Sequence, residues 1–101
     1  MSELVKVANL SEVEPGRGMV AEIRDKALAV FNIDGTFYAI DNTCLHRGGP
    51  LGEGELAGDT VTCPWHGWEY NVKTGACVNN PAACVGTYLV VVDGNDVKVE
   101  L

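Results

Sequence analysis

The chain has 101 residues, of which 47% are hydrophobic and twelve are glycine, so we expect one domain with a modest core and many turns. Fourteen acidic residues against seven basic ones give a formal net charge of −7. This surplus argues against nucleic acid as a partner, because binding to phosphate needs a basic surface. It fits either simple solubility or electrostatic steering toward basic proteins. No apolar run is long enough to cross a bilayer and no secretion signal begins the chain, so we expect a cytoplasmic protein without a membrane partner.

The N-terminal part of the chain has the pattern of β-structure. Short apolar segments alternate with turn signals and lie at residues 4–7, 19–23, 27–33 and 36–40. Asp34-Gly35 separates two of these segments and predicts a tight hairpin. Residues 9–13 predict a helical turn that ends before Pro15. We expect these strands to form a scaffold for the middle of the chain.

The middle of the chain combines loops with short strands. Residues 43–51 and 79–82 are predicted as loops, and residues 52–55 as a polar connection. Short strands are predicted at 60–62 and at 69–72, where polar and apolar residues alternate. No stretch is rich enough in serine or proline to act as a linker between independent domains.

We therefore expect a single domain over residues 1–101, with a subdomain at roughly 42–84 inserted into the scaffold. The C-terminal part returns to the scaffold, first as a buried strand at 88–92 and then as an alternating strand at 96–101. The face of the last strand that is expected to point inward carries Val97, Val99 and Leu101.

Two pairs of cysteine and histidine are the most informative feature of the sequence. Cys44 and His46 are separated by one residue, Cys63 and His66 by two, and sixteen residues lie between the pairs. Each pair has glycine and proline beside it, which predicts two loop tips. Two thiolates and two imidazoles suit a soft or borderline metal and not calcium or magnesium. The chain contains no other histidine.

Zinc and iron compete for this ligand set. Zinc fingers usually place two cysteines in one pair and two histidines in the other, which differs from the arrangement here. One cysteine and one histidine in each loop suits a binuclear iron–sulfur cluster, with Cys44 and Cys63 on one iron and His46 and His66 on the other. A zinc-binding structural domain stays open as an alternative. Colour separates the two, because a zinc protein is colourless and a ferric sulfide cluster is brown-red.

The residues around the pairs resemble those of the Rieske [2Fe–2S] domain. Gly48-Gly49-Pro50-Leu51 follows the first pair, and the second pair stands within Cys63-Pro64-Trp65-His66-Gly67-Trp68. The resemblance continues through residues 69–75 to Pro81 and covers nearly the whole chain. It implies an all-β Rieske fold, in which an antiparallel β-sandwich scaffold carries an inserted cluster-binding subdomain. It also implies one [2Fe–2S] cluster with four ligands, namely Cys44, His46, Cys63 and His66.

Within the family, the sequence is similar to low-potential Rieske ferredoxins and to the Rieske domains of aromatic-ring dioxygenases. Respiratory Rieske proteins have bridging cysteines where this chain has Gly49 and Trp65, and a serine donor where it has Trp68. Tyr70 matches the family's tyrosine that donates a hydrogen bond to a cysteine sulfur. The missing donor and bridge predict a reduction potential near the low end of the Rieske range, about −150 mV.

An electron carrier is the function that these features favour. A mononuclear iron site of an oxygenase needs further histidines, and a reductase needs a nucleotide-binding fingerprint, and the chain has neither. We expect a monomeric one-electron carrier, and not an enzyme, that accepts electrons from a flavin-containing reductase and delivers them to a terminal oxygenase. The alternative within the fold is the small Rieske subunit of a nitrite reductase, which would co-purify with a large partner.

Three secondary expectations concern the remaining cysteines and the surface. Cys77 and Cys84 are expected to be reduced, buried small side chains, with a disulfide between them as the alternative. The loop around Pro81 is expected to shield the cluster, unless it is a plain surface turn. Leu45, Trp65 and Pro81 are expected to form an apolar rim for docking, unless they serve packing.

Overall fold

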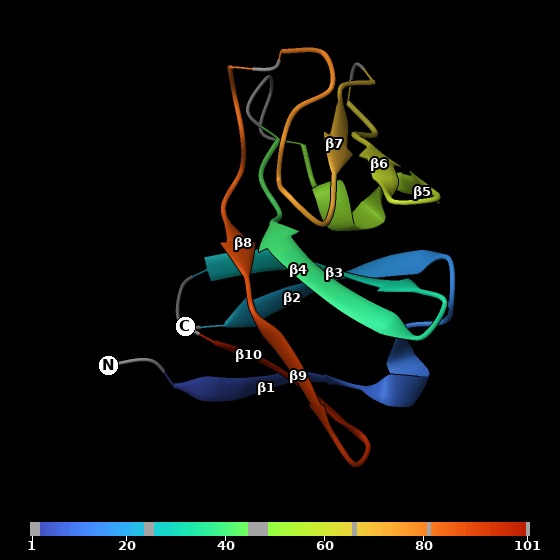
Figure 1. Ribbon diagram of the computed structural model, residues 1–101, viewed down its shortest axis with the longest axis vertical. Coiled ribbons are helices and arrows are strands. Elements are labelled where there is room, and N and C mark those ends of the chain that lie inside the picture. Colours follow the sequence, from blue (N-terminus) through green and yellow to red (C-terminus); the bar gives the residue numbers. More distant parts are fainter. Residues whose placement is uncertain (1–2, 24–25, 45–48, 66, 81, 101) are drawn as a thin grey trace.

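The computed structural model describes residues 3–23, 26–44, 49–65, 67–80 and 82–100. Over these ranges the chain forms three antiparallel sheets and two short 3-10 turns, and it has a radius of gyration of 12.5 Å (Figure 1). The fold is all-β, as the sequence predicts. None of the helical turns in the described ranges has the length and apolarity that a membrane span requires.

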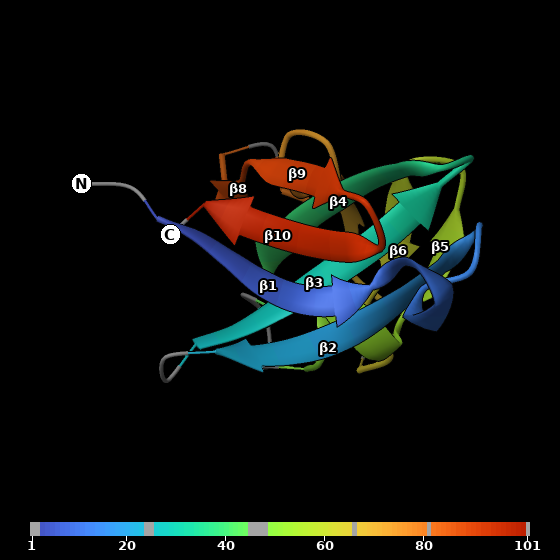
Figure 2. The same ribbon diagram turned by 90° about the horizontal axis from the view of Figure 1, so that it is seen from below.

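Two of the sheets form a sandwich that serves as the scaffold. One sheet has the order β1-β10-β9, with β1 at Leu4–Asn9, β10 at Asp96–Glu100 and β9 at Val90–Asp93. The other has the order β2-β3-β4-β8 and consists of β2 (Arg17–Ile23), β3 (Lys26–Ile33), β4 (Thr36–Asp41) and β8 (Thr87–Tyr88). Figure 2 shows the first sheet lying across the second. Their shared core contains Ala8, Val13, Ala21, Leu28, Val30, Phe37, Ala39, Val97 and Val99.

Strand β3 is the central element, because it is buried on both faces. Leu28 and Val30 point into the core of the sandwich, whereas Ala29 and Phe31 point into a second core on the opposite face. A strand covered on both sides reads as a continuous apolar run and not as an alternating one, which is the pattern of residues 27–31. Each large side chain that is fully buried in this way contributes about 1.5–3 kcal/mol.

The predicted hairpin joins β3 to β4. Ile33 pairs with Thr36, so the loop has two residues, Asp34 and Gly35. Both have positive φ angles, 51° and 91°, as a type I′ turn requires, and this turn matches the natural twist of the strands. The turn therefore fixes the register that places Phe31 and Ile40 on the same face of the sheet.

The third sheet lies against the second core. It has the order β5-β6-β7, with β5 at Glu55–Ala57, β6 at Thr60–Thr62 and β7 at Glu69–Asn71. We call this sheet and the loops around it, within residues 42–86, the upper unit, because it stands above the scaffold in Figure 1. Scaffold and upper unit contribute to one continuous core, which contains Ala29, Phe31, Ile40, Cys44, Leu51, Val61, Cys63, Tyr70, Val72, Cys77 and Val85.

A 3-10 turn at Leu51–Glu53, η2, lies directly on β2. A Cβ atom on Gly52 would lie 2.7 Å from the carbonyl oxygen of Met19, so only glycine allows this approach. The buried side chain of Asn42 holds the turn from the other side, because its Oδ1 accepts the N–H of Gly52 at 2.7 Å. The upper unit is thus fixed to the scaffold by backbone contact as well as by the shared core.

The structure confirms most of the predicted elements and corrects two of them. The helical turn predicted at 9–13 is η1, a 3-10 turn at Leu10–Glu12. The supposed buried strand at 88–92 is instead two short strands, β8 and β9, separated by Leu89, which is 61% exposed. The polar connection predicted at 52–55 contains most of η2 and the first residue of β5, a strand that the prediction missed. Val97 and Val99 are buried as expected, whereas Leu101 lies outside the described residues.

Candidate metal centre

Cys44 and Cys63 begin two loops that are closed in the same way. The N–H of Cys44 donates to the carbonyl of Gly49 at 2.9 Å, and the N–H of Cys63 donates to the carbonyl of Trp68 at 2.7 Å. In both cases the carbonyl lies five residues after the cysteine. Both cysteines are only 1% exposed, so each loop begins in the core. The predicted ligands His46 and His66 fall inside these two loops but lie outside the described residues.

The first loop touches the cysteine of the second loop. A Cβ atom on Gly49 would lie 2.8 Å from Sγ of Cys63 and 2.9 Å from Cγ of Trp65. These distances are shorter than real Cβ atoms tolerate, so a side chain at position 49 would force the loops apart. The sequence predicted that Gly49 lets the backbone come close to sulfur, but not that Gly49 contacts the cysteine of the other loop, because these two residues are far apart in the chain.

A hydrogen-bonding group lies beside each of the two sulfur atoms. The hydroxyl of Tyr70 lies 3.4 Å from Sγ of Cys44, and the N–H of Trp65 donates to Sγ of Cys63 at 3.4 Å. Tyr70 is fully buried, so its ring packs in the core while its hydroxyl meets the sulfur, and the predicted contact is confirmed. With Cys44 as a metal-bound thiolate, the hydroxyl is the donor, since a thiolate has no proton to give.

The two thiols also influence each other. Burial raises the pKa of the Cys63 thiol, the Trp65 amide lowers it, and the hydrogen bond and charge of Cys44 raise it further. Two neighbouring thiols that are buried in this way resist ionisation unless a cation compensates their charge. A bound metal ion supplies that charge, and coordinated thiols are deprotonated for this reason.

This donor set fits a metal–thiolate centre. All four cysteines lie in the described part of the chain and none of them forms a disulfide, so Cys44 and Cys63 both keep their thiol groups. The part of the chain that the structure describes holds no group of three or more candidate ligands. It contains two of the four residues proposed as ligands, and the two histidines lie outside it.

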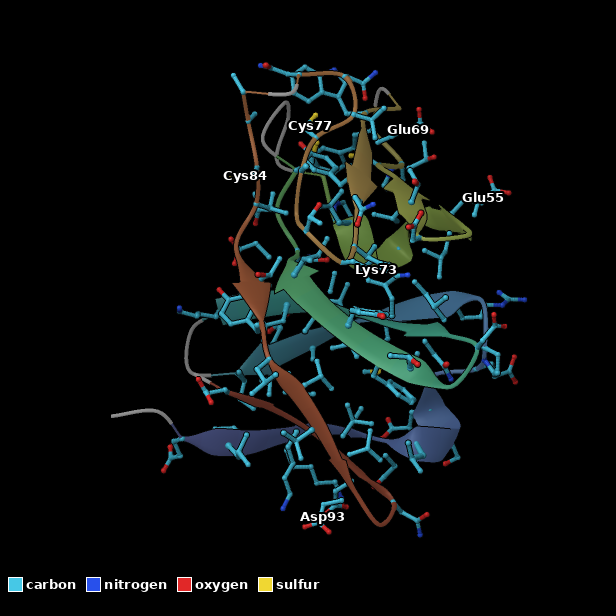
Figure 3. The ribbon with its side chains drawn as sticks, viewed as in Figure 1. Glu55, Glu69, Lys73, Cys77, Cys84 and Asp93 are labelled. Atoms are coloured by element: carbon cyan, nitrogen blue, oxygen red, sulfur yellow. The ribbon has the colours of Figure 1, made fainter. Side chains whose placement is uncertain are left out.

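Cys77 and Cys84 differ from each other. Cys77 is buried in the same core as Cys44 and Cys63, as expected, whereas Cys84 is exposed, so the prediction of a second buried thiol is wrong. Ala76 pairs with Cys84 in an antiparallel bridge, and Cys77 donates its N–H to Ala83. Neighbouring residues of such a pairing point to opposite faces, which keeps the two thiols apart (Figure 3).

The apolar rim can be described at only one of its three predicted positions. Trp65 is 51% exposed, two residues after the buried Cys63, so it presents an aromatic surface beside the centre. Leu45 and Pro81 lie outside the described residues. Trp68, which replaces a serine donor of the respiratory proteins, packs against the core.

Comparison with known proteins places this centre in a family. The model of the Rieske [2Fe-2S] domain matches residues 3–93 of the chain. The chain is 36% identical to ferredoxin CarAc of Metapseudomonas resinovorans over 97 residues, which cover 94% of this chain and 91% of that protein. It is 35% identical to the ferredoxin component of biphenyl 2,3-dioxygenase from Rhodococcus jostii (strain RHA1) over 100 residues, which cover 97% and 92%.

Solved structures agree in fold. One of them, a complex of reduced oxygenase and oxidized ferredoxin in carbazole 1,9a-dioxygenase, aligns with a TM-score of 0.85 and 35% identity over 95% of this chain and 91% of that chain. A putative small subunit of an NADH-dependent nitrite reductase from Mycobacterium tuberculosis aligns with a TM-score of 0.90 over 100% and 96%, but with only 20% identity. The second likeness therefore concerns the fold alone.

A β-sandwich that supports two cysteine-led loops, with their buried sulfurs side by side, defines a protein of the Rieske type. The chain belongs to the Rieske [2Fe-2S] domain family, and within it to the ferredoxins of aromatic dioxygenase systems. Its cofactor is a Rieske [2Fe–2S] cluster, and it is the electron-transfer component of such a system and not an enzyme.

Gly49 allows a first prediction. Gly49→Ala should reduce iron loading severely, because the new Cβ overlaps the sulfur of Cys63. Iron and sulfide per chain, together with the visible spectrum, measure the effect. Gly94→Ala is the control, since it strains a positive-φ turn at the opposite end of the molecule with open space around the Cβ. Normal cluster loading in Gly49→Ala would contradict the contact described above.

The hydroxyl of Tyr70 allows a second prediction. Tyr70→Phe should lower the reduction potential by roughly 20–60 mV, the one-electron equivalent of a typical hydrogen bond. The sign follows because a donor to sulfur stabilises the more negative, reduced state. Protein-film voltammetry gives the value. Tyr38→Phe is the control, because it keeps the ring that lies 5.7 Å from Nζ of Lys73. Equal potentials for wild type and Tyr70→Phe would exclude this role.

Proposed function

We propose that this chain carries single electrons from a flavin-containing reductase to a terminal oxygenase, through a [2Fe–2S] cluster held by Cys44, His46, Cys63 and His66. The observation that supports this assignment best is the buried pair of thiols at the meeting point of two similarly closed loops. We further propose a monomeric, cytoplasmic protein that forms one domain over residues 1–101, with residues 42–84 as its cluster-binding subdomain.

The steep change in burial along the second loop supports an exposed position for the histidines. Exposure rises from 1% at Cys63 to 51% at Trp65, directly before His66. We therefore place the iron bound by Cys44 and Cys63 toward the core, and the iron bound by His46 and His66 toward solvent. His46 and His66 would then hold the bound cluster where a docked partner could approach it closely.

The described residues of the chain fulfil two tasks in this function. The core around Cys44, Cys63 and Tyr70 excludes water from the sulfur side of the centre. The hydroxyl of Tyr70 and the N–H of Trp65 are in place before any electron arrives. Fixed donors need little rearrangement when the charge of the centre changes, which favours fast transfer. The bound cluster itself supplies a single centre that accepts and releases one electron.

The two alternative functions receive less support. The nitrite reductase subunit from Mycobacterium tuberculosis shares 20% of its sequence with this chain, whereas two ferredoxins of dioxygenase systems share 35%. A zinc-binding domain would use the same two thiols, but the matching family model is that of an iron–sulfur domain. The partners, finally, are inferred from relatives, one of which was solved in complex with its oxygenase.

The ligand assignment is tested by replacing each histidine. His46→Ala and His66→Ala should both abolish the Rieske cluster, because each removes a neutral nitrogen ligand from the same iron. Iron content and the EPR spectrum of the reduced protein are measured. Cys84→Ala is the matched control, since that exposed cysteine should be dispensable. Wild-type iron content and an unchanged spectrum in both histidine variants would refute the assignment.

Electrostatic steering is tested by the salt dependence of reduction. The rate of reduction by the cognate reductase should fall as salt rises, because attraction between exposed charges is screened beyond about 8 Å at physiological ionic strength. Glu69→Gln should flatten this dependence more than Asp93→Asn, because Glu69 lies at the end of the molecule that carries the cysteines and Asp93 at the opposite end (Figure 3).

Truncation of the apolar rim should act differently. Trp65→Ala should slow the transfer at every salt concentration, because it removes contact surface and no charge. Stopped-flow measurements across a salt series distinguish the two effects. A rate that is flat or rises with added salt would mean that the acidic surface serves solubility alone.

A further inference from the structure

The chain enters the upper unit and leaves it at adjacent points. It enters after Asp41, the last residue of β4, and it returns through Gly86, just before β8 (Figure 1). The regular pairing of β4 with β8 covers only Ala39 with Tyr88 and Ile40 with Thr87. Beyond this short ladder, the two crossing segments are held by other contacts.

The side chain of Asp41 supplies these contacts. One carboxylate oxygen accepts the hydroxyl of Tyr88 at 2.6 Å, and the other accepts the N–H of Gly86 at 2.8 Å. The N–H of Asp41 in turn donates to the carbonyl of Gly86 at 2.9 Å. A Cβ atom on Gly86 would lie 2.8 Å from the carboxylate, so this close arrangement depends on glycine. Hydrogen bonds to a charged acceptor are among the stronger ones in proteins.

Tyr88 is well suited as a permanent donor to this carboxylate. Burial, followed by the hydrogen bond and charge of Asp41, raises the pKa of Tyr88 to about 12, so its hydroxyl keeps its proton at neutral pH. The ring of Tyr88 is also held in place, because Nζ of Lys26 lies 5.5 Å from its centroid. The contact thus has a fixed geometry on the scaffold side.

Asp41 joins the start of the first cysteine-led loop to the segment that follows the loop at 79–82. Toward the C-terminus of Asp41, the first metal loop begins three residues later at Cys44. In the other direction, the segment before Gly86 is tied to the upper unit, because Val85 donates its N–H to Gly75 at 2.8 Å and Ala83 accepts the N–H of Cys77 at 3.1 Å. That segment leads directly from the loop at 79–82.

We infer that Asp41 is a positioning residue that holds the segment 82–86 against the start of the first cysteine-led loop, and so controls how firmly the buried thiol of Cys44 is held in the core that it shares with Cys77 and Val85. The inference rests on the proposed function, because it takes Cys44 to be a ligand. Asp41 acts through Gly86 and Tyr88 and does not itself contact the sulfur ligands in any of these interactions.

The test measures how easily the cluster is lost from the folded protein. Asp41→Asn replaces one of the two acceptor oxygens with a donor, and Tyr88→Phe removes one of the two donors while keeping the ring. Bleaching of the cluster absorbance by an iron chelator at neutral pH should be roughly tenfold to a hundredfold faster in Asp41→Asn, which is the loss expected for a hydrogen bond to a charged group. Tyr88→Phe should give a smaller increase.

Asn32→Ala is the matched control. Buried Asn32 also makes two hydrogen bonds through its side chain, to the carbonyl of Val13 and from the N–H of Gly35, both at 2.8 Å, but it does so within the scaffold. It should lower the melting temperature without accelerating bleaching at a temperature where all variants are folded. Bleaching in Asp41→Asn that is no faster than in Asn32→Ala would overturn the inference.

Amide exchange separates this inference from the proposed function. The N–H groups of Gly86, Val85 and Cys77 should exchange faster in Asp41→Asn and in Tyr88→Phe, while those of β10 stay unchanged. This exchange is measured on the same preparations, whatever metal they carry, so it tests the positioning role even if the ligand assignment fails. Unchanged exchange at all three groups would refute the role of Asp41.

Discussion

Two thiols that lie side by side and away from water are the constraint on which this structure depends. Burial, followed by the hydrogen bond and charge of Cys44, raises the pKa of the Cys63 thiol, although the Trp65 amide opposes this shift. A metal bound by the proposed ligands Cys44 and Cys63 would compensate this charge, which is consistent with the proposed centre. The hydroxyl of Tyr70 and the N–H of Trp65 then meet sulfur atoms that carry negative charge.

Strand β3 explains how so small a chain keeps these thiols in place. Because it is buried on both faces, the same strand closes the sandwich with Leu28 and Val30 and supports the metal loops with Ala29 and Phe31. The buried residues described in the upper unit therefore share one core with Ala29, Phe31 and Ile40 of the scaffold. Substitutions in β3 are therefore expected to disturb the packing around Cys44 and Cys63 directly. Substitutions in β1 or β10 would disturb the core of the sandwich, which β3 separates from the two thiols.

The parts of this architecture that sequence predicted are local in the chain. The hairpin at Asp34-Gly35 follows from two neighbouring residues, and the strands around it follow from apolar runs. The exposure of Cys84 depends on its pairing with Ala76, which periodicity does not specify. Strand β5 was missed because its first residue, Glu55, continues the polar run that begins at Gly52. The role of Asp41 was not predictable either, because it joins residues that are 45 positions apart. The two cysteine–histidine pairs were recognised by their spacing, but the contact of Gly49 with Cys63 required coordinates.

The two cysteine-led loops are held together by close packing at Gly49, without a disulfide. Gly49 and Trp65 occupy the positions at which respiratory Rieske proteins carry a bridging disulfide. A Cβ atom on Gly49 would lie 3.0 Å from Cβ of Trp65, closer than the roughly 3.8 Å typical of a disulfide. The loops therefore approach more closely here than a covalent bridge would let them, and they do so because glycine has no side chain. Closure by packing around Gly49, together with the hydrogen bonds of the Asp41 carboxylate to Gly86 and Tyr88, needs no oxidised cysteines. Such closure would suit the cytoplasmic location proposed above, where disulfides are rare.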